Sequence, residues 1–384
     1  MHKLATLSSA FLLITLALTA NASRNCSDYI KHVAQYYQCQ HTDKSSLLGY
    51  GSNGIAFLVT STTSKQKFVL KVSQAHNPNS YAKLDSIYEL LKNEKYIVKR
   101  YYSAIHEMEL YEILEYGEMG SLYDNLPLMQ LFKDQNKLLE LFGHIVEGIA
   151  AMHKQGVIHA DIKADNVVLM GPTEPRIIDF DVSLKKNAGA SARGTRSYMA
   201  PEVLRQISMG LIMKYTEKQD IWSLGVLLYA MLYGKTPYYF ERSRNPNGSR
   251  SKGLATHDEM VEFVNSGKII VTAGTSKEII DILEAMLQTE ANNRKNLEDV
   301  HQMIDAALQK DELNYISADT HVLTNKGNFY IATKVVVEEP DNSANTIKTV
   351  AVAALILLLS LTVIVVSAVC GRQKAEQIRA QLAT

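Results

Sequence analysis

Three residues with oxygen-bearing side chains, Asp161, Asn166 and Asp179, stand near apolar segments in the middle of this 384-residue chain. Asp161 and Asn166 lie within the run Val-Ile-His-Ala-Asp-Ile-Lys-Ala-Asp-Asn, which also contains Lys163, and Asp179 directly follows two isoleucines. Carboxylate and amide oxygens are the ligands that magnesium prefers, and a carboxylate can accept the proton of a hydroxyl nucleophile. The spacing therefore predicts a site for magnesium and a hydroxyl nucleophile.

A second group of residues is suited to phosphate binding. Gly49, Gly51 and Gly54 form a G-x-G-x-x-G loop, and Lys71 interrupts the apolar run Phe-Val-Leu-Lys-Val at residues 68–72. A buried charge without a partner is costly, so this lysine needs an anion, which nucleotide phosphates and an acidic helix residue would supply. A dinucleotide-binding loop would open a helix, whereas the apolar residues after this loop read as a strand.

Regular elements are expected to position these groups. Apolar runs predict strands at residues 57–59, 68–72 and 110–114, and an amphipathic pattern predicts a helix over residues 138–152. Further along the chain, the run Gly-Thr-Arg-Ser-Tyr-Met-Ala-Pro-Glu at residues 194–202 precedes an apolar helix that contains Asp-Ile-Trp-Ser-Leu-Gly. Any one of these motifs is weak by itself, and their order and spacing together are specific.

In these motifs the chain resembles the eukaryotic protein kinase family over residues 43–308. The resemblance implies an α+β, two-lobed protein kinase fold with a small β-rich N-lobe, a larger helical C-lobe, and ATP between them. Lys163 two residues after Asp161, and Gly194-Thr195 before Ala-Pro-Glu, are similar to the serine/threonine branch. The implied activity is transfer of the ATP γ-phosphate to serine or threonine hydroxyls of a protein substrate.

The resemblance also implies a role for each site residue. Asp161 would accept the hydroxyl proton, Lys163 would stabilise the γ-phosphate, Lys71 would pair with the α- and β-phosphates, and Asn166 and Asp179 would hold Mg2+. A structural ion pair is implied between Glu202 and Arg294. The remaining nucleotide-contacting positions would be Leu48, Gly49, Gly51, Gly54, Ala56, Val69, the gatekeeper Leu114, the hinge Glu115-Tyr116-Gly117, and Val168.

Three features depart from the family pattern. Ala160 stands where many members have an arginine before the catalytic aspartate, and Asp181 stands where the metal-binding triplet normally ends in glycine. The helix acid expected beside Lys71 is Asp85 by ungapped spacing or Glu89 one turn later, and Glu89 is preferred. These departures keep a second interpretation open, a nucleotide-binding pseudokinase that acts as a scaffold at a membrane.

Two uncharged apolar segments predict the topology. Residues 4–20 follow a basic start and precede small residues, which is typical of a secretory signal cleaved after Ala22, with an uncleaved anchor as the alternative. Residues 349–370 carry no charge and are long enough to cross a bilayer, with three basic residues after them and two shortly before. The expected organisation is a signal peptide (1–22), an N-terminal extension (23–42), a kinase domain (43–308), a juxtamembrane stalk (309–348), a transmembrane helix (349–370) and a short basic cytoplasmic tail (371–384).

This organisation predicts a single-pass membrane protein of the secretory pathway or cell surface, with a lumenal or extracellular kinase domain. Cys26 and Cys39 would then pair in an oxidising lumen, the alternative being two free thiols, and Asn25 and Asn247 would be glycosylation acceptors. With 40 basic and 40 acidic residues the formal net charge is zero, which argues against nucleic acid as a partner. The expected partners are ATP, a protein substrate with a serine or threonine acceptor, and the lipid bilayer.

Overall fold

The computed structural model describes residues 26–39, 46–51, 54–75, 78–131, 134–237, 239–241, 252–254, 261, 269–272, 274–310, 320–323 and 330–331. All of them belong to one compact unit that ends at Ile331. The predicted signal peptide, the predicted transmembrane helix, Asn25 and Asn247 lie outside these residues. Within the described ranges, no helix combines the length and the apolar character needed to cross a membrane.

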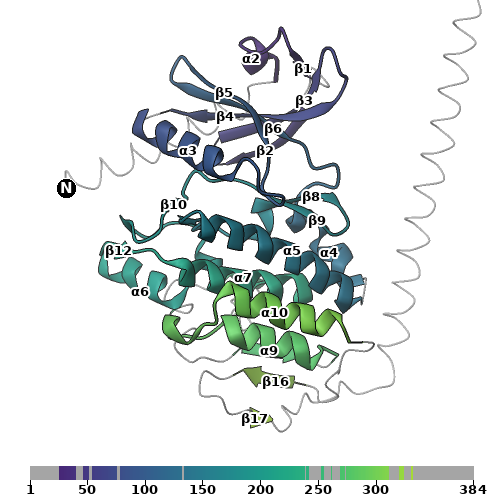
Figure 1. The fold of residues 1–384 in the computed structure, drawn as a ribbon, viewed down its shortest axis with the longest axis vertical. Helices are drawn as coiled ribbons and strands as arrows, with labels where there is room; N and C mark the ends of the chain where they lie inside the picture. The colour runs from purple at the N-terminus through teal and green to yellow at the C-terminus, as the bar shows by residue number, and fades with distance from the viewer. Residues whose placement is uncertain are drawn as a thin grey trace, which may run out of the picture. The chain divides into compact units, whose positions relative to one another are not determined.

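A six-stranded antiparallel sheet forms the smaller lobe (Figure 1). Its strand order is β1-β3-β4-β6-β5, with β2 paired to β3. Partly exposed and buried residues alternate along β3 and β4, so one face of each strand packs into a core that contains Phe57, Leu70 and Ile113. Leu84 and Leu91 of helix α3 pack into a second core. The elements are β1 (Tyr37–Cys39), β2 (Leu47–Gly51), β3 (Gly54–Ser61), β4 (Lys67–Gln74), α3 (Pro78–Leu91), β5 (Arg100–His106) and β6 (Glu109–Glu115).

The three strands predicted for this lobe are therefore confirmed as parts of β3, β4 and β6. β6 is buried along nearly its whole length because it lies between β4 and β5, whereas β5 is the edge strand and is largely exposed. The sheet places the glycine-rich hairpin, Lys71 and the segment after β6 on adjacent strands, which is the arrangement that a nucleotide site requires.

The N-terminal extension is part of this lobe. Helix α2 (Cys26–Ile30) and β1 are joined by a disulfide between Cys26 and Cys39, and β1 pairs with β3. Cys26 and Tyr29 are buried against Phe57 in the core of the sheet. Of the two alternatives left open by the sequence, the disulfide is the one that the structure contains. It ties α2 to β1, and the pairing of β1 with β3 joins both to the sheet.

The larger lobe is mainly helical (Figure 1). Helix α7 is its centre and is buried over most of its surface, which explains why the sequence there is apolar on all sides. α7 begins with a capping box between Thr216 and Gln219 and ends at Gly234, which adopts a left-handed conformation (φ 67°). The helices are α4 (Leu122–Leu131), α5 (Gln135–Lys154), α6 (Pro201–Met209), α7 (Glu217–Tyr233), α9 (Lys277–Met286) and α10 (Leu297–Leu308).

The helix predicted at residues 138–152 and the apolar helix around residues 220–225 are confirmed as α5 and α7. The arrangement of a β-sheet lobe and a helical lobe confirms the predicted two-lobed kinase fold. Three short 3-10 turns complete the lobe, η2 (Ala164–Asn166), η3 (Arg196–Tyr198) and η4 (Ala291–Asn293).

Short antiparallel strand pairs hold the segments that carry the site. β7 (Val157–Ile158) pairs with β10 (Leu184–Lys185), β8 (Val167–Gly171) with β9 (Glu174–Ile177), and β11 (Gly189–Ala190) with β12 (Met213–Lys214). Together they fix both ends of the loop at residues 159–166, which contains Asp161 and is called the catalytic loop below. They also fix the course of the segment after Asp179.

Two further sheets lie near the end of the compact unit. β13 (Tyr239–Glu241) pairs antiparallel with β14 (Lys252–Leu254), and β15 (Ile269–Thr272), β16 (Thr320–Leu323) and β17 (Tyr330–Ile331) form a three-stranded sheet. β16 and β17 come from the segment expected to be a stalk, so part of that segment pairs with a strand of the kinase domain.

Candidate active site

The glycine-rich hairpin is formed by β2 and β3, which pair from Leu47–Phe57 to Gly51–Gly54. Gly54 has a φ of 133°, and a Cβ atom there would lie 2.4 Å from the carbonyl oxygen of Val72. Only glycine fits this close approach to the next strand. At Gly49 and Gly51 an added Cβ would meet open space, so these positions leave the backbone free to approach a phosphate.

Lys71 lies in the middle of β4 and its side chain is 15 % exposed. Its ammonium group donates hydrogen bonds to Asp179 Oδ1 at 2.9 Å and to Asp181 Oδ2 at 3.0 Å. Burial lowers the pKa of Lys71, but the nearby carboxylates of Asp179, Asp181 and Glu112 outweigh it and hold the pKa well above its usual value. Lys71 is therefore a fixed positive charge at the centre of the site.

Asp181 is the second carboxylate in this group. Burial raises the pKa of Asp181, Lys71 lowers it, and the neighbouring Asp179 raises it again, with a net upward shift. The Lys71 ammonium is therefore shared between two carboxylates. In place of a glycine, the chain thus has a side chain that competes with Asp179 for Lys71.

The predicted pairing of Glu89 with Lys71 is not found in the structure. The Glu89 side chain is 63 % exposed and accepts from Lys92 at 2.9 Å, and Asp85 pairs with Arg100. The reason is the phase of helix α3: successive residues are rotated by about 100°, so Glu89 points to solvent when the preceding residue, Tyr88, points inward.

The Tyr88 side chain of α3 is buried and packs against other aromatic rings. Its ring centroid lies 5.1 Å from that of Phe180, which in turn lies 5.8 Å from the ring of His159. The guanidinium of Arg100 stacks over Tyr88 at 4.1 Å. These contacts connect α3 to the catalytic loop and to the residue after Asp179, and they couple the position of the helix to the site.

Two of the predicted adenine-binding residues, Gly117 and Val168, lie side by side. Gly117 follows β6, and a Cβ there would lie 3.0 Å from the carbonyl oxygen of Leu169 and 3.1 Å from Val168 Cβ. Leu114 is buried, and the Glu115 carboxylate accepts from the Nε of Arg176 at 3.3 Å. The side chains of Leu48, Ala56, Val69 and Val168 all retain partial exposure. Their contact with a base stays a prediction.

A carboxylate of helix α7 holds the start of the catalytic loop in place. Asp220 of α7 accepts from the backbone N–H groups of His159 (2.8 Å) and Ala160 (2.9 Å), and from the His153 ring (2.9 Å). Ala160 adopts a left-handed conformation with φ 65°, which a non-glycine residue rarely adopts. The Asp220 side chain is fully buried in a largely apolar helix, and these hydrogen bonds are what compensates the buried charge.

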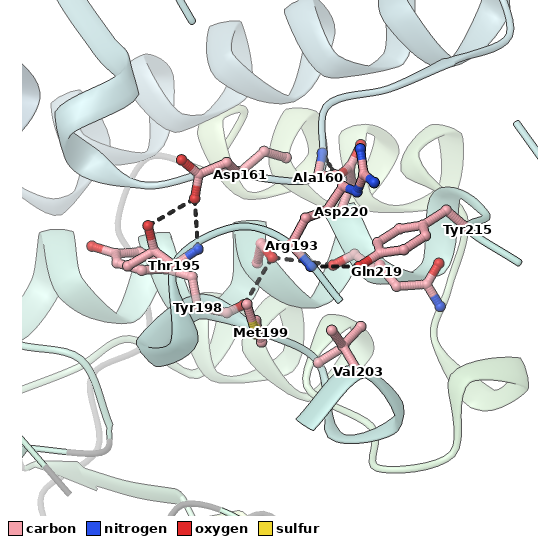
Figure 2. Close-up of a pocket in the computed structure, with 13 residues that line it drawn as sticks. Ala160, Asp161, Arg193, Thr195, Tyr198, Met199, Val203, Tyr215, Gln219 and Asp220 are labelled. Carbon is pink, nitrogen blue, oxygen red and sulfur yellow. Dashed lines mark hydrogen bonds between the residues drawn. The ribbon is translucent and has the colours of Figure 1, made fainter. Parts of the chain in front are cut away.

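Asp161 is the centre of a hydrogen-bond network (Figure 2). Its Oδ1 accepts from the backbone N–H and the hydroxyl of Thr195, both at 2.7 Å, and its Oδ2 accepts from Lys163 at 2.9 Å and from Asn166 Nδ2 at 3.1 Å. Lys163 also donates to the Thr195 hydroxyl at 2.9 Å. Four hydrogen bonds from three residues thus hold the carboxylate in one orientation.

Asn166 and Asp179 are the predicted metal ligands, and their environment suits that role. Nδ2 of Asn166 donates to the backbone oxygen and carboxylate of Asp161, so the amide oxygen is the atom left for a cation. The N–H of Ile178 donates to the Asn166 carbonyl at 3.0 Å, which brings the chain before Asp179 alongside Asn166. An amide oxygen and a carboxylate are oxygen ligands of the kind that Mg2+ prefers. Phosphate and water oxygens would complete the coordination of the ion.

Hydrogen bonds of Arg193 hold the segment after Asp181 in place. Figure 2 shows Arg193 and Tyr215 beside Ala160, and the Tyr215 hydroxyl accepts from the N–H of Arg193 at 3.1 Å. The guanidinium of Arg193 donates to the carbonyl groups of Val182 (3.3 Å) and Ser191 (3.4 Å). Arg193 therefore ties two parts of this segment together.

The predicted pair of Glu202 and Arg294 is confirmed. Arg294 is buried and donates through Nη1 to Oε1 at 2.8 Å and through Nη2 to Oε2 at 2.7 Å. Gln219 also donates to Glu202, and the guanidinium lies 5.1 Å from the centroid of the Trp222 ring. This bidentate pair anchors the start of α6 to the helical lobe and touches none of the reacting groups.

Comparison with known proteins agrees with this geometry. Residues 42–304 match the family model described as protein kinase domain. The chain is 30 % identical over 208 residues to a Rho-associated protein kinase of Caenorhabditis briggsae (51 % of this chain, 17 % of the relative). It is 32 % identical over 203 residues to the serine/threonine-protein kinase MRCK beta of Homo sapiens (50 % and 11 %).

A third relative is mitogen-activated protein kinase kinase 10 of Arabidopsis thaliana, 29 % identical over 198 residues, which are 51 % of this chain and 64 % of that protein. The chain spans less than two thirds of the length of each of these relatives. The matched domain, by contrast, covers about two thirds of the chain itself and includes every predicted site residue. The chain belongs to the protein kinase domain family.

Proposed function

We propose that the chain is an ATP-dependent protein serine/threonine kinase. The observation that carries the proposal is the network around Asp161, which orients a carboxylate beside Lys163 while Lys71 and Asp179 face each other at 2.9 Å. Phosphoryl transfer asks the protein to place two oxygens in line and to neutralise charge on the transferred group. All the side chains for this task are present.

The chemical roles follow from these positions. Asp161 accepts the proton of the serine or threonine hydroxyl as its oxygen attacks the γ-phosphorus, and ADP leaves with the bridging oxygen. Lys163 neutralises charge on the transferred phosphoryl group, and Lys71 holds the phosphates that remain. Asn166 and Asp179 would hold Mg2+, which would supply electrostatic stabilisation of the phosphate charge.

A transfer assay tests this function. The purified full chain should transfer radiolabel from Mg-ATP to a generic basic protein substrate, and chelation of Mg2+ should abolish the signal because the phosphates then lack their counter-ion. Asp161→Asn is the matched control, since it preserves the shape of the side chain but removes the proton acceptor. Equal transfer by wild type and Asp161→Asn would refute the assignment.

Asp181 favours a second candidate, a nucleotide-binding pseudokinase scaffold. Its carboxylate accepts a hydrogen bond of 3.0 Å from Lys71, a contact that a glycine at this position would not make. Mg-ATP should then raise the melting temperature of the protein while no label is transferred. The same preparation of protein therefore separates the two candidates.

We further propose that the domain is tethered to a membrane from the lumenal or extracellular side. The sequence supports this through the apolar segments at residues 4–20 and 349–370, and the Cys26–Cys39 disulfide is compatible with an oxidising compartment. In sealed microsomes the domain should resist added protease until detergent is present. Deglycosylation should reduce its mass, and the double variant Asn25→Gln, Asn247→Gln should lack that shift. Complete digestion without detergent would place the domain in the cytosol.

Activity should not depend on phosphorylation of the segment at residues 182–199. In many kinases an arginine before the catalytic aspartate binds a phosphate on this segment, but Ala160 cannot. Here the strand pairs β7–β10 and β11–β12, together with Arg193, hold the segment. Ser191→Ala and phosphatase treatment should each leave most of the transfer rate.

Thr195→Val is the matched control for this experiment, because it removes the hydroxyl that contacts Asp161 and Lys163 and should lower the rate. A loss of more than about tenfold, or about 1.4 kcal/mol of barrier, in both Ser191→Ala and the phosphatase-treated protein would mean that a phosphate does order the segment.

A further inference from the structure

Glu112 is a carboxylate at the centre of the buried strand β6. Its side chain is 1 % exposed, and its neighbours on the strand, Tyr111 and Ile113, belong to the hydrophobic core. Oε1 accepts a long hydrogen bond of 3.5 Å from Arg100, and Oε2 has no hydrogen-bond partner among the described residues. A buried carboxylate with an unpaired oxygen destabilises a fold, so its presence calls for a functional explanation.

The register of the sheet places Glu112 directly opposite Lys71. β4 and β6 are antiparallel, and Lys71 and Glu112 are Cα partners in this pair. Side chains of directly opposite residues lie on the same face of a sheet, with Cβ atoms about 5 Å apart. Burial raises the pKa of Glu112, and Lys71 is the strongest of the charges that counter this rise. The two groups therefore belong to one electrostatic unit.

Helix α3 supplies no carboxylate to this unit. Asp85 and Glu89 are its only acids, and they pair with Arg100 and with Lys92. Between them, Tyr88 turns its ring toward Phe180 and fills the inward position of the helix.

Lys71 retains a hydrogen-bond donor for Glu112. An ammonium group has three N–H donors, and within the described residues two of them are used by Asp179 and Asp181. Asp179 is also the predicted metal ligand and cannot serve Lys71 alone. Glu112 is fixed in the sheet and has an oxygen available on the same face.

We propose that Glu112 is a positioning residue that orients the Lys71 ammonium toward the nucleotide phosphates, the task for which helix α3 offers no acid. This inference rests on the proposed function, because it assumes that Lys71 binds those phosphates. It assigns the strand next to β4, in place of the helix, as the source of the counter-ion. The lysine would then stay oriented when the helix shifts.

A double-mutant cycle tests the proposal. The dissociation constant of a fluorescent ATP analogue with Mg2+ is measured for the full-length wild type, Glu112→Gln, Lys71→Met and the double variant. Glu112→Gln should weaken binding by about tenfold when Lys71 is present and by less than about twofold in the Lys71→Met background, because residues that act as a unit are not additive. Equal losses in both backgrounds would overturn the proposal, as would wild-type affinity in Glu112→Gln.

Stability measurements separate positioning from a structural role. Without nucleotide, Glu112→Gln should melt at or above the temperature of the wild type, since it removes a poorly paired buried charge. Glu112→Asp keeps the charge and should recover part of the affinity, and Glu109→Gln, on the same strand but away from Lys71, should bind like the wild type. A lower melting temperature together with an additive cycle would assign Glu112 to the core alone.

The outcome for Glu112 can be distinguished from the outcome for the proposed function. If the wild type binds the analogue and shows a non-additive cycle but transfers no phosphate, kinase activity is refuted and the role of Glu112 stands. If the wild type binds no nucleotide, both proposals fail.

Discussion

Asp179→Ala should lower phosphate transfer by at least about a thousandfold, or about 4 kcal/mol of barrier. The substitution removes the predicted metal ligand and one of the two carboxylates that hold Lys71. The side chain is 18 % exposed and lies outside the hydrophobic core, so the domain should remain folded. Lys71→Met should have a similar effect because it removes the positive charge at the phosphates. Initial rates of radiolabel transfer, combined with melting curves of the same samples, measure both.

Glu89→Ala is the control for this experiment. Glu89 is preferred to Asp85 as the predicted partner of Lys71, whereas the structure pairs it with Lys92 on the exposed side of α3. Glu89→Ala should therefore transfer at nearly the wild-type rate. A loss comparable to that of Lys71→Met would restore the sequence-based assignment and contradict the helix phase seen here. Wild-type transfer by Asp179→Ala would overturn the kinase function.

The sequence predicted which side chains lie together best where a single tight loop fixes their spacing. Asp161, Lys163 and Asn166 lie within six consecutive residues, and η2 closes that loop with a local hydrogen bond from Asn166 to Lys163. Gly54 lies in a short hairpin, and a side chain there would collide with the neighbouring strand. This requirement for glycine is likewise set by local structure. Local motifs of this kind specify geometry almost by themselves.

Prediction was weaker where two distant segments must meet. Whether Asp85, Tyr88 or Glu89 faces Lys71 depends on how α3 is rotated against the sheet, and a shift of one residue turns the helix by about 100°. The pairing of Glu112 with Lys71 depends on the register of β6, which the sequence pattern does not determine. The sequence did contain a signal for Glu112, which is an acidic residue in the apolar run at residues 110–114. A charged side chain at such a position needs a partner.

The end of the compact unit illustrates the same limit. β16 and β17 come from the segment predicted to be a juxtamembrane stalk, yet β16 pairs with β15 about 50 residues before it. Asp220 shows the converse case, in which a buried acid positions a loop 60 residues away through two backbone hydrogen bonds. Such long-range contacts depend on the tertiary fold, which residue spacing alone does not give.

Arg294→Met should lower the free energy of unfolding by about 3–5 kcal/mol, the range typical of removing one partner of a buried ion pair. Arg294 is buried and donates to both oxygens of Glu202, so its loss leaves that carboxylate without its counter-charge and removes a donor from three backbone carbonyl groups. Urea unfolding of the wild type and the variant measures the change. The double variant Arg294→Met, Glu202→Met is the control and should recover part of the loss, because no uncompensated charge remains. A single variant as stable as the wild type would contradict the structural role of the pair.

The same pair should make stability depend on acid. Burial raises the pKa of Glu202, but the hydrogen bonds and charge of Arg294 lower it further, and the net pKa lies below the ordinary value of 4.5. A carboxyl group with a depressed pKa in the folded state contributes its full stability above the unfolded value and loses it as the pH falls through the folded value. The difference in unfolding free energy between wild type and Arg294→Met should therefore be largest near neutral pH and shrink as the pH falls, because protonation of Glu202 removes the charge that Arg294 stabilises. A difference that stays constant under more acidic conditions would mean that packing against Trp222, and not the ionised pair, is what Arg294 contributes.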